Sequence, residues 1–149
     1  MILRDNSCRF CQIIAGDFPE QIIAENEQVI AFLSLENHPL VVTREHIPDI
    51  YSLPAHLGAA VMEMVVKVSK SVKKALKCDG VYLTQSNEPA GGQTVFHFHV
   101  HVYPAWDEGF NRAITEFVHR VSDRENVTEE MKVELAKKLR NQITSKEQK

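Results

Sequence analysis

Three histidines alternate with apolar residues in the stretch GGQTVFHFHVHVYP, which runs from Gly91 to Pro104 and contains His97, His99 and His101. Its β-branched and aromatic residues favour a strand, and the side chains of a strand alternate between its two faces. We therefore predict a strand with the three imidazoles on one face and the apolar residues in a core. Three crowded imidazoles cannot all be protonated at low cost near neutral pH. The row therefore indicates a metal site, or a nucleophile with acid–base neighbours, rather than three solvated side chains.

The composition is that of an ordinary globular domain, with 25% charged and 44% hydrophobic residues, and we expect one domain over residues 1–149. The net charge of -3 provides no basic field to hold long nucleic acid. No apolar run approaches the roughly 20 residues that span a bilayer, which predicts no membrane partner. The first residues, MILRDNSC, lack a signal-peptide core. We therefore expect a cytoplasmic protein whose cysteines form no structural disulfides.

The pattern along the chain predicts an α+β fold, in which a mostly antiparallel five-stranded sheet is separate from the helices. Turn residues divide four more expected strands: Ile22–Glu25, Val29–Leu35, Leu40–Thr43 and Val81–Ser86. A long central helix is expected over Pro54–Lys77, with lysines on its solvated face. A short N-terminal helix would begin at a Ser7 cap and stop at Gly16. Thr128 would cap a C-terminal helix, within an extension of about 127–145 beyond a core of about 8–106.

Cys8 and Cys11 form a Cys-x-x-Cys pair within the expected N-terminal helix. This spacing leaves both sulfurs on one side of a turn and suits metal binding. By itself the pair also suits redox chemistry.

The histidine row resembles the signature of the histidine triad (HIT) family, in which histidine and apolar residues alternate. The resemblance extends over about Cys8–Trp106. It includes the Cys-x-x-Cys segment, Ala31-Phe32-Leu33, His38 with the apolar residues after it, His46 and the glycine-rich loop before the row. It implies a HIT-like fold and a nucleotide hydrolase or nucleotidyl transferase that cleaves at the α-phosphate of an AMP-type nucleotide. The substrate would be a phosphoramidate or a dinucleoside polyphosphate.

The family pattern implies a role for each matching residue. His99 would be the nucleophile that forms a covalent nucleotidyl-histidine, His101 would assist the leaving group, and His97 and His38 would complete the catalytic set. Phosphate contacts are expected from Gln93 and the backbone of Thr94, and either Ser86 or Asn87 would supply a further polar contact. The positions that would line the nucleoside pocket are Phe10, Ile13, Phe32, Leu33, Ser34 and Leu35. The apolar members of this set suit an ordinary core equally well.

The zinc-bearing branch of the family implies one structural Zn²⁺, bound by Cys8, Cys11, His46 and His97. Such a Cys₂His₂ set is closed, so the metal would tie the N-terminal helix to the sheet and would not activate water. The family also implies a homodimer that pairs the long helices and extends the sheet, and a single symmetric interface is the expected assembly.

Three positions depart from the family pattern. Ser34 stands where the family usually has an Asp that holds the ribose hydroxyls, and a serine cannot bind two hydroxyls as a carboxylate does. The Glu36-Asn37 loop before His38 is shorter than usual, and Ala105 replaces a frequent Arg. The missing Arg weakens the case for a long polyphosphate substrate. Ser34 and the short loop leave a second hypothesis open, a zinc-stabilised nucleotide sensor or interaction protein with little catalysis. A Cys-x-x-Cys redox protein is the third.

Overall fold

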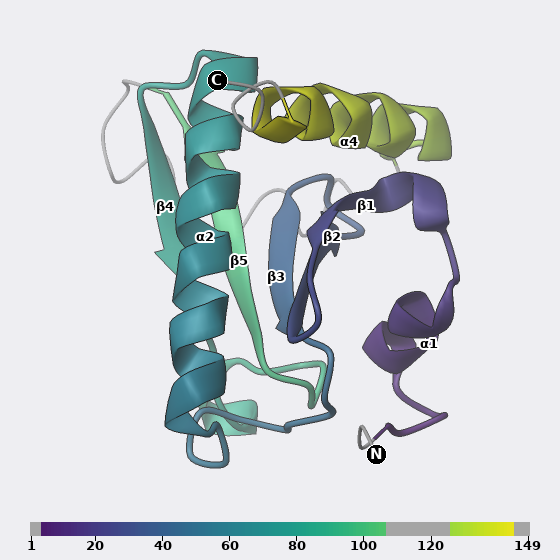
Figure 1. Cartoon of the computed structure of the whole chain (residues 1–149), viewed down its shortest axis with the longest axis vertical. Helices are drawn as coiled ribbons and strands as arrows, with labels where there is room; N and C mark the ends of the chain where they lie inside the picture. The colour runs from purple at the N-terminus through teal and green to yellow at the C-terminus, as the bar shows by residue number, and fades with distance from the viewer. Residues whose placement is uncertain (1–3, 107–125, 145–149) are drawn as a thin grey trace.

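The computed structural model describes residues 4–106 and 126–144, which form a five-stranded sheet and its helices (Figure 1). The strands are β1 (Ile22–Glu25), β2 (Val29–Leu33), β3 (Pro39–Thr43), β4 (Gly80–Thr84) and β5 (His99–Ala105). Their order in the sheet is β1-β2-β3-β5-β4, and every neighbouring pair is antiparallel. The predicted α+β fold with a five-stranded antiparallel sheet is confirmed.

Two tight connections set the register of the first three strands. Between β1 and β2, the Asn26 side-chain oxygen accepts hydrogen bonds from the amides of Gln28 and Val29, each 2.9 Å long. Between β2 and β3, the Ser34 amide donates to the His38 carbonyl over 2.8 Å and closes a short loop. This loop places Ser34 and His38 side by side at one end of the sheet.

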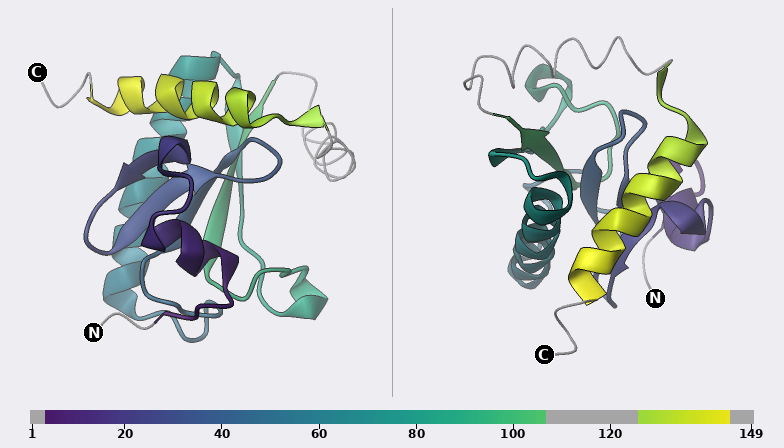
Figure 2. Two further views of the ribbon diagram at one scale, coloured as in Figure 1. Left: turned by 90° about the vertical axis from the view of Figure 1, so that its right-hand side faces the viewer. Right: turned by 90° about the horizontal axis from the view of Figure 1, so that it is seen from above.

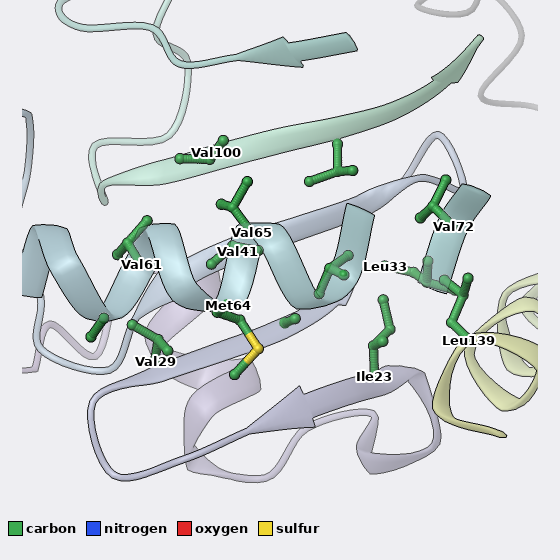
Figure 3. Close-up of a cluster of buried hydrophobic side chains, with 14 of the residues drawn as sticks. Ile23, Val29, Leu33, Val41, Val61, Met64, Val65, Val72, Val100 and Leu139 are labelled. Carbon is green, nitrogen blue, oxygen red and sulfur yellow. The ribbon is translucent and has the colours of Figure 1, made fainter. Parts of the chain in front are cut away.

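The helix α2 (Ala55–Leu76) covers one face of the sheet. Every second residue of β2 faces it, so Val29, Ala31 and Leu33 pack with the apolar side of α2 in one core cluster (Figure 3). Its lysines are exposed, as the sequence predicts. The last helix, α4 (Glu129–Thr144), packs against α2 and β1 and adds Leu139 to the same cluster.

The opposite face of the sheet carries the short helix α1 (Arg9–Ala15), with the sheet between it and α2 (Figures 1 and 2). The alternate residues of β2, Ile30 and Phe32, form a second cluster with Phe10 and Ile14 of α1. Gly16 ends α1 at a φ of 126°, a conformation that favours glycine. The predicted Ser7 cap is wrong, because the Ser7 amide and hydroxyl both donate to the Asp5 carboxylate instead.

The ladder of β5 begins at His99, so the prediction that His97 lies within this strand is wrong. The amide of Phe98 donates to the carbonyl of Ile47, outside the ladder, and turns the chain before His99. The strands β2 and β4 also end two residues earlier than predicted, at Leu33 and Thr84. The Thr128 cap is confirmed, since its hydroxyl accepts from the Met131 amide. Within the described ranges, no helix combines the length and hydropathy needed to cross a bilayer.

Candidate functional site

A cavity of about 180 Å³ opens on the face of the sheet that carries α1. His99 and His101 of β5 line it, together with Phe32 of β2 and Phe10 of α1. The 3₁₀ turn η1 (Pro19–Gln21) and the first residues of α4 complete its wall. The cavity therefore places two imidazoles beside an apolar slot.

His99 has one ring nitrogen committed to the backbone. Its Nδ1 lies 2.7 Å from the carbonyl oxygen of His97, and a carbonyl only accepts, so Nδ1–H is the donor. In the neutral ring the lone pair then resides on Nε2. Burial lowers the pKa of His99, which favours the neutral ring, and the Phe10 ring packs against it at right angles with the ring centroids 5.1 Å apart. His99 therefore presents a fixed, uncharged nitrogen nucleophile.

His101 lies between His99 and a second pair of rings. Its Nδ1 is 2.8 Å from His38 Nε2 and 3.2 Å from the Tyr103 hydroxyl. Burial is the main cause that lowers the pKa of His101 to about 3, and repulsion between the charged forms of His101 and His99 is the smaller cause. His101 is therefore neutral near pH 7, and its ring is oriented by His38 and Tyr103.

His97 belongs to a separate cluster, outside the cavity wall, whose side chains are of types that can bind a metal ion. Its Nε2 lies 2.7 Å from the Thr43 carbonyl and so carries the proton, which leaves the Nδ1 lone pair facing Cys8 Sγ at 3.5 Å and Cys11 Sγ at 3.6 Å. His46 Nδ1 is 3.4 Å from Cys11 Sγ. Mainly through burial, the pKa of His97 falls to about 4, so this ring is neutral, as metal ligation requires.

All four possible ligand atoms of Cys8, Cys11, His46 and His97 lie within 4.8 Å of one another. Two sulfurs and two imidazole nitrogens at this separation fit a tetrahedral structural Zn²⁺. The cluster joins α1 to the end of β3 and to the segment that leads into β5. The predicted ligand set is thus brought together by the fold.

The predicted nucleoside residues all line the cavity, namely Phe10, Ile13, Phe32, Leu33, Ser34 and Leu35. Phe10 and Phe32 meet edge to face, with ring centroids 5.4 Å apart. Leu35 is 60% exposed, so it lies at the mouth of the cavity rather than in the core. Their roles toward a nucleoside stay predictions.

The four predicted phosphate residues are placed differently. Thr94 lines the cavity, whereas Gln93, Ser86 and Asn87 are absent from its wall. The Gln93 amide donates to the carbonyls of Pro48 and Val95, and its oxygen accepts from the Glu88 amide. Asn87 accepts from the Ile50 amide. Gln93 and Asn87 thus hold the loop before β5 in this structure, and phosphate contacts from them stay predictions.

A polar cluster in the cavity wall was missed by the sequence reasoning. Lys132 of α4 is 5% exposed, and its ammonium donates to Glu129 over 2.6 Å. The buried Gln21 of η1 donates to the other carboxylate oxygen of Glu129. The three side chains come from segments more than 100 residues apart. No local sequence pattern indicates this cluster, because the burial of Lys132 is known only from the packing of α4.

The family model for the HIT domain matches residues 15–107. This chain belongs to the HIT family. The HIT match covers all five strands and both histidines of the cavity.

Three similar proteins extend this finding. Protein hit of Bacillus subtilis is 33% identical over 69% of this chain and 74% of its own length. Adenosine 5'-monophosphoramidase hnt1 of Schizosaccharomyces pombe is 30% identical over 72% of this chain and 81% of its own length. The crystal structure of a Zn-bound histidine triad family protein from Mycobacterium smegmatis shares the fold, with a TM-score of 0.76 at 24% identity over 95% of this chain and 96% of that one.

Proposed function

We propose that this HIT protein is a nucleotide hydrolase that works through a covalent nucleotidyl-His99. The observation that supports it most directly is the hydrogen bond from His99 Nδ1–H to the His97 carbonyl, which leaves the Nε2 lone pair available. The family membership and the similarity to a monophosphoramidase support a small nucleotide as the substrate. The substrate class is an AMP-type phosphoramidate or dinucleoside polyphosphate.

In the first step, His99 Nε2 would form a bond to the α-phosphorus while the bond from phosphorus to the leaving group breaks. The leaving group takes the bonding electron pair, and His101 supplies its proton. In the second step a water oxygen attacks phosphorus and gives a proton to His101. The phosphorus–nitrogen electron pair then returns to His99, which restores both rings.

The apolar slot of the cavity would hold the base. The rings of Phe10 and Phe32 provide an apolar, aromatic surface of the kind that a purine packs against. Thr94 lines the same cavity as the two histidines, so it is the candidate for a phosphate contact. Gln93 and Asn87 would act by keeping this loop in place.

Zinc would bind to Cys8, Cys11, His46 and His97, where it supplies a structural cross-link and no reactive water. These residues hold α1 against the sheet and the backbone before His99 in position. Metal analysis of the purified protein tests this assignment. We expect about one zinc per chain and its loss in Cys11→Ser, whereas Cys78→Ser, at a cysteine outside the cluster, should retain it.

The proposed assembly is a homodimer through α2 and the edge strand β4. Exposed apolar side chains lie on both elements, namely Met62 and Val66 on α2 and Leu83 on β4. β4 is the last strand in the sheet order of the described residues, and a second copy would pair with it there to extend the sheet. Light scattering measures the mass directly; a monomer at micromolar concentration would contradict the dimer.

The decisive experiment mixes the protein with an AMP phosphoramidate, quenches without strong acid and measures the intact mass. We expect a transient adduct of one nucleotidyl group and steady release of AMP. His99→Asn should lose the adduct and lower turnover by about 10³-fold or more. His56→Asn, at an exposed histidine outside the cavity, is the control and should keep both.

Turnover that survives His99→Asn would rule out the covalent mechanism. Nucleotide binding without any adduct or product would favour the sensor hypothesis instead.

A further inference from the structure

The hydroxyl of Ser34 has a defined set of partners in the short loop between β2 and β3. It accepts hydrogen bonds from the amides of Glu36 at 3.1 Å and His38 at 3.2 Å. A hydroxyl has two acceptor lone pairs and one hydrogen. Both lone pairs are therefore used, and Ser34 is 8% exposed, so its hydrogen needs a partner within the protein.

That partner is His38 Nδ1, which lies 3.0 Å from Ser34 Oγ. Because the serine oxygen has no lone pair left, Ser34 O–H must be the donor and His38 Nδ1 the acceptor. The proton of neutral His38 then resides on Nε2. His38 is 1% exposed and stacks on Tyr103 with ring centroids 4.0 Å apart, so the ring has no room to turn over.

The next ring in the chain is His101, whose Nδ1 lies 2.8 Å from His38 Nε2. Since His38 Nε2–H donates, His101 Nδ1 accepts. The neutral His101 ring must therefore carry its proton on Nε2, the nitrogen remote from His38. The Tyr103 hydroxyl lies 3.2 Å from the same Nδ1.

We propose that Ser34 is a positioning residue that acts through His38 to place the proton of His101 on Nε2, where it can reach a leaving group. The inference rests on the proposed function and deepens it, because it assigns a task to the residue that departs from the family pattern. Ser34 borders the cavity, but its hydroxyl is fully committed to the loop and to His38. The departure from Asp thus converts a position expected to bind ribose into one that orients the acid.

A first test reads the protons directly and needs no substrate. Long-range ¹H–¹⁵N spectra of the labelled full chain identify which ring nitrogen of each histidine carries hydrogen. At pH 7.5 we expect protons on Nε2 and bare Nδ1 atoms for both His38 and His101. A proton on Nδ1 of either ring overturns the proposal. A positively charged His38, with protons on both nitrogens, would also overturn it, and the Glu36 carboxylate 3.8 Å from Nδ1 would favour that form.

A second test separates orientation of the acid from binding of ribose. It compares two AMP derivatives, a nitrophenyl ester whose leaving group needs no proton and an alkyl amide whose leaving group does. Ser34→Ala should lower kcat on the amide by about tenfold or more, a fraction of the usual general-acid contribution. The ester should change by less than about threefold, and Ser34→Thr, which keeps the hydroxyl, should restore the amide rate.

The affinity for AMP completes this second test. An unchanged Kd for AMP in Ser34→Ala, with the loss confined to the amide, supports the proposal. Equal losses on both substrates, or a weaker Kd without dependence on the leaving group, would show that Ser34 binds the nucleoside and would overturn it. Should the wild-type protein turn over neither compound, the proposed function fails, while the spectra of the first test still decide the role of Ser34.

Discussion

Burial decides the charge of the histidine row at the scale of single residues. His101 has its pKa lowered to about 3, mainly by desolvation, whereas an unfolded histidine titrates near 6.5. Between these values the unfolded chain binds the proton and the folded chain does not. The free energy of unfolding therefore falls as the pH is lowered from about 6.5 toward 3.

This linkage gives the first prediction. Denaturant unfolding between pH 7 and pH 4.5 should show a decline that is shallower in His101→Asn, by up to about 1.4 kcal/mol per pH unit. The variant removes one group with a lowered pKa and leaves the Cys₂His₂ cluster intact, so the difference between the two profiles isolates His101. Parallel profiles would mean that His101 is not buried as neutral imidazole.

At the scale of secondary-structure elements, the packing of α4 supplies part of the cavity wall that no sequence motif indicates. The first turns of α4 bring Lys132 and Glu129 to the same cavity as His99, although they follow it by some thirty residues in the chain. The side chain of Lys132 is 6% exposed and ends on the Glu129 carboxylate. The C-terminal helix is thus part of the site as well as a cover for α2 and β1.

The second prediction tests this contribution of α4. Lys132→Met keeps the length of the buried side chain and removes its charge, and we expect the Kd for AMP to rise by about tenfold, or roughly 1.4 kcal/mol. Lys138→Met, on the exposed side of the same helix where Lys138 pairs with Glu134, should leave the Kd unchanged. Isothermal titration calorimetry measures both. Equal affinities would show that Lys132 serves only its ion pair with Glu129 and does not contribute to nucleotide binding.

The third prediction concerns the docking of α4. Leu139 is fully buried in the apolar cluster between α4 and α2 (Figure 3). The Ser71 hydroxyl donates to its carbonyl over 2.7 Å. Leu139→Ala should lower the free energy of unfolding by about 2–5 kcal/mol. Met131→Ala, at a residue that is 45% exposed on the same helix, should cost well under half of that. Similar losses in the two variants would contradict the packing.

The sequence predicted most elements because their signals are local. The apolar run of β2, the alternation along β5, the stripe of α2 and the Thr128 cap each depend on neighbouring residues, and the structure bears them out. The error at His97 has a tertiary origin, since Phe98 donates to Ile47 instead of continuing the ladder. Likewise, no local pattern could show that the Gln93 amide would serve the backbone or that Lys132 would reach the cavity.

At the scale of the whole molecule, the two faces of the sheet have different supports. The α2 face rests on a large apolar cluster to which α4 contributes. The α1 face has a smaller cluster, and the seven-residue helix α1 is too short to persist without tertiary contacts. The proposed zinc at the Cys₂His₂ cluster would provide a second attachment of α1 and would help to keep Phe10 beside His99.

The last prediction follows from this division. Removal of metal by a chelator should lower the Tm, speed proteolysis within α1 and weaken binding of AMP, because α1 supplies Phe10 and Ile13 to the cavity. Hydrogen exchange should rise in α1 while the α2 face keeps its protection, since none of the four ligands lies on α2. Cys11→Ser should reproduce the effect without a chelator, and Cys78→Ser should respond to the chelator as the wild type does. Uniform loss of protection over both faces would show instead that the metal site supports the entire fold, and an unchanged α1 would show that apolar packing alone holds it in place.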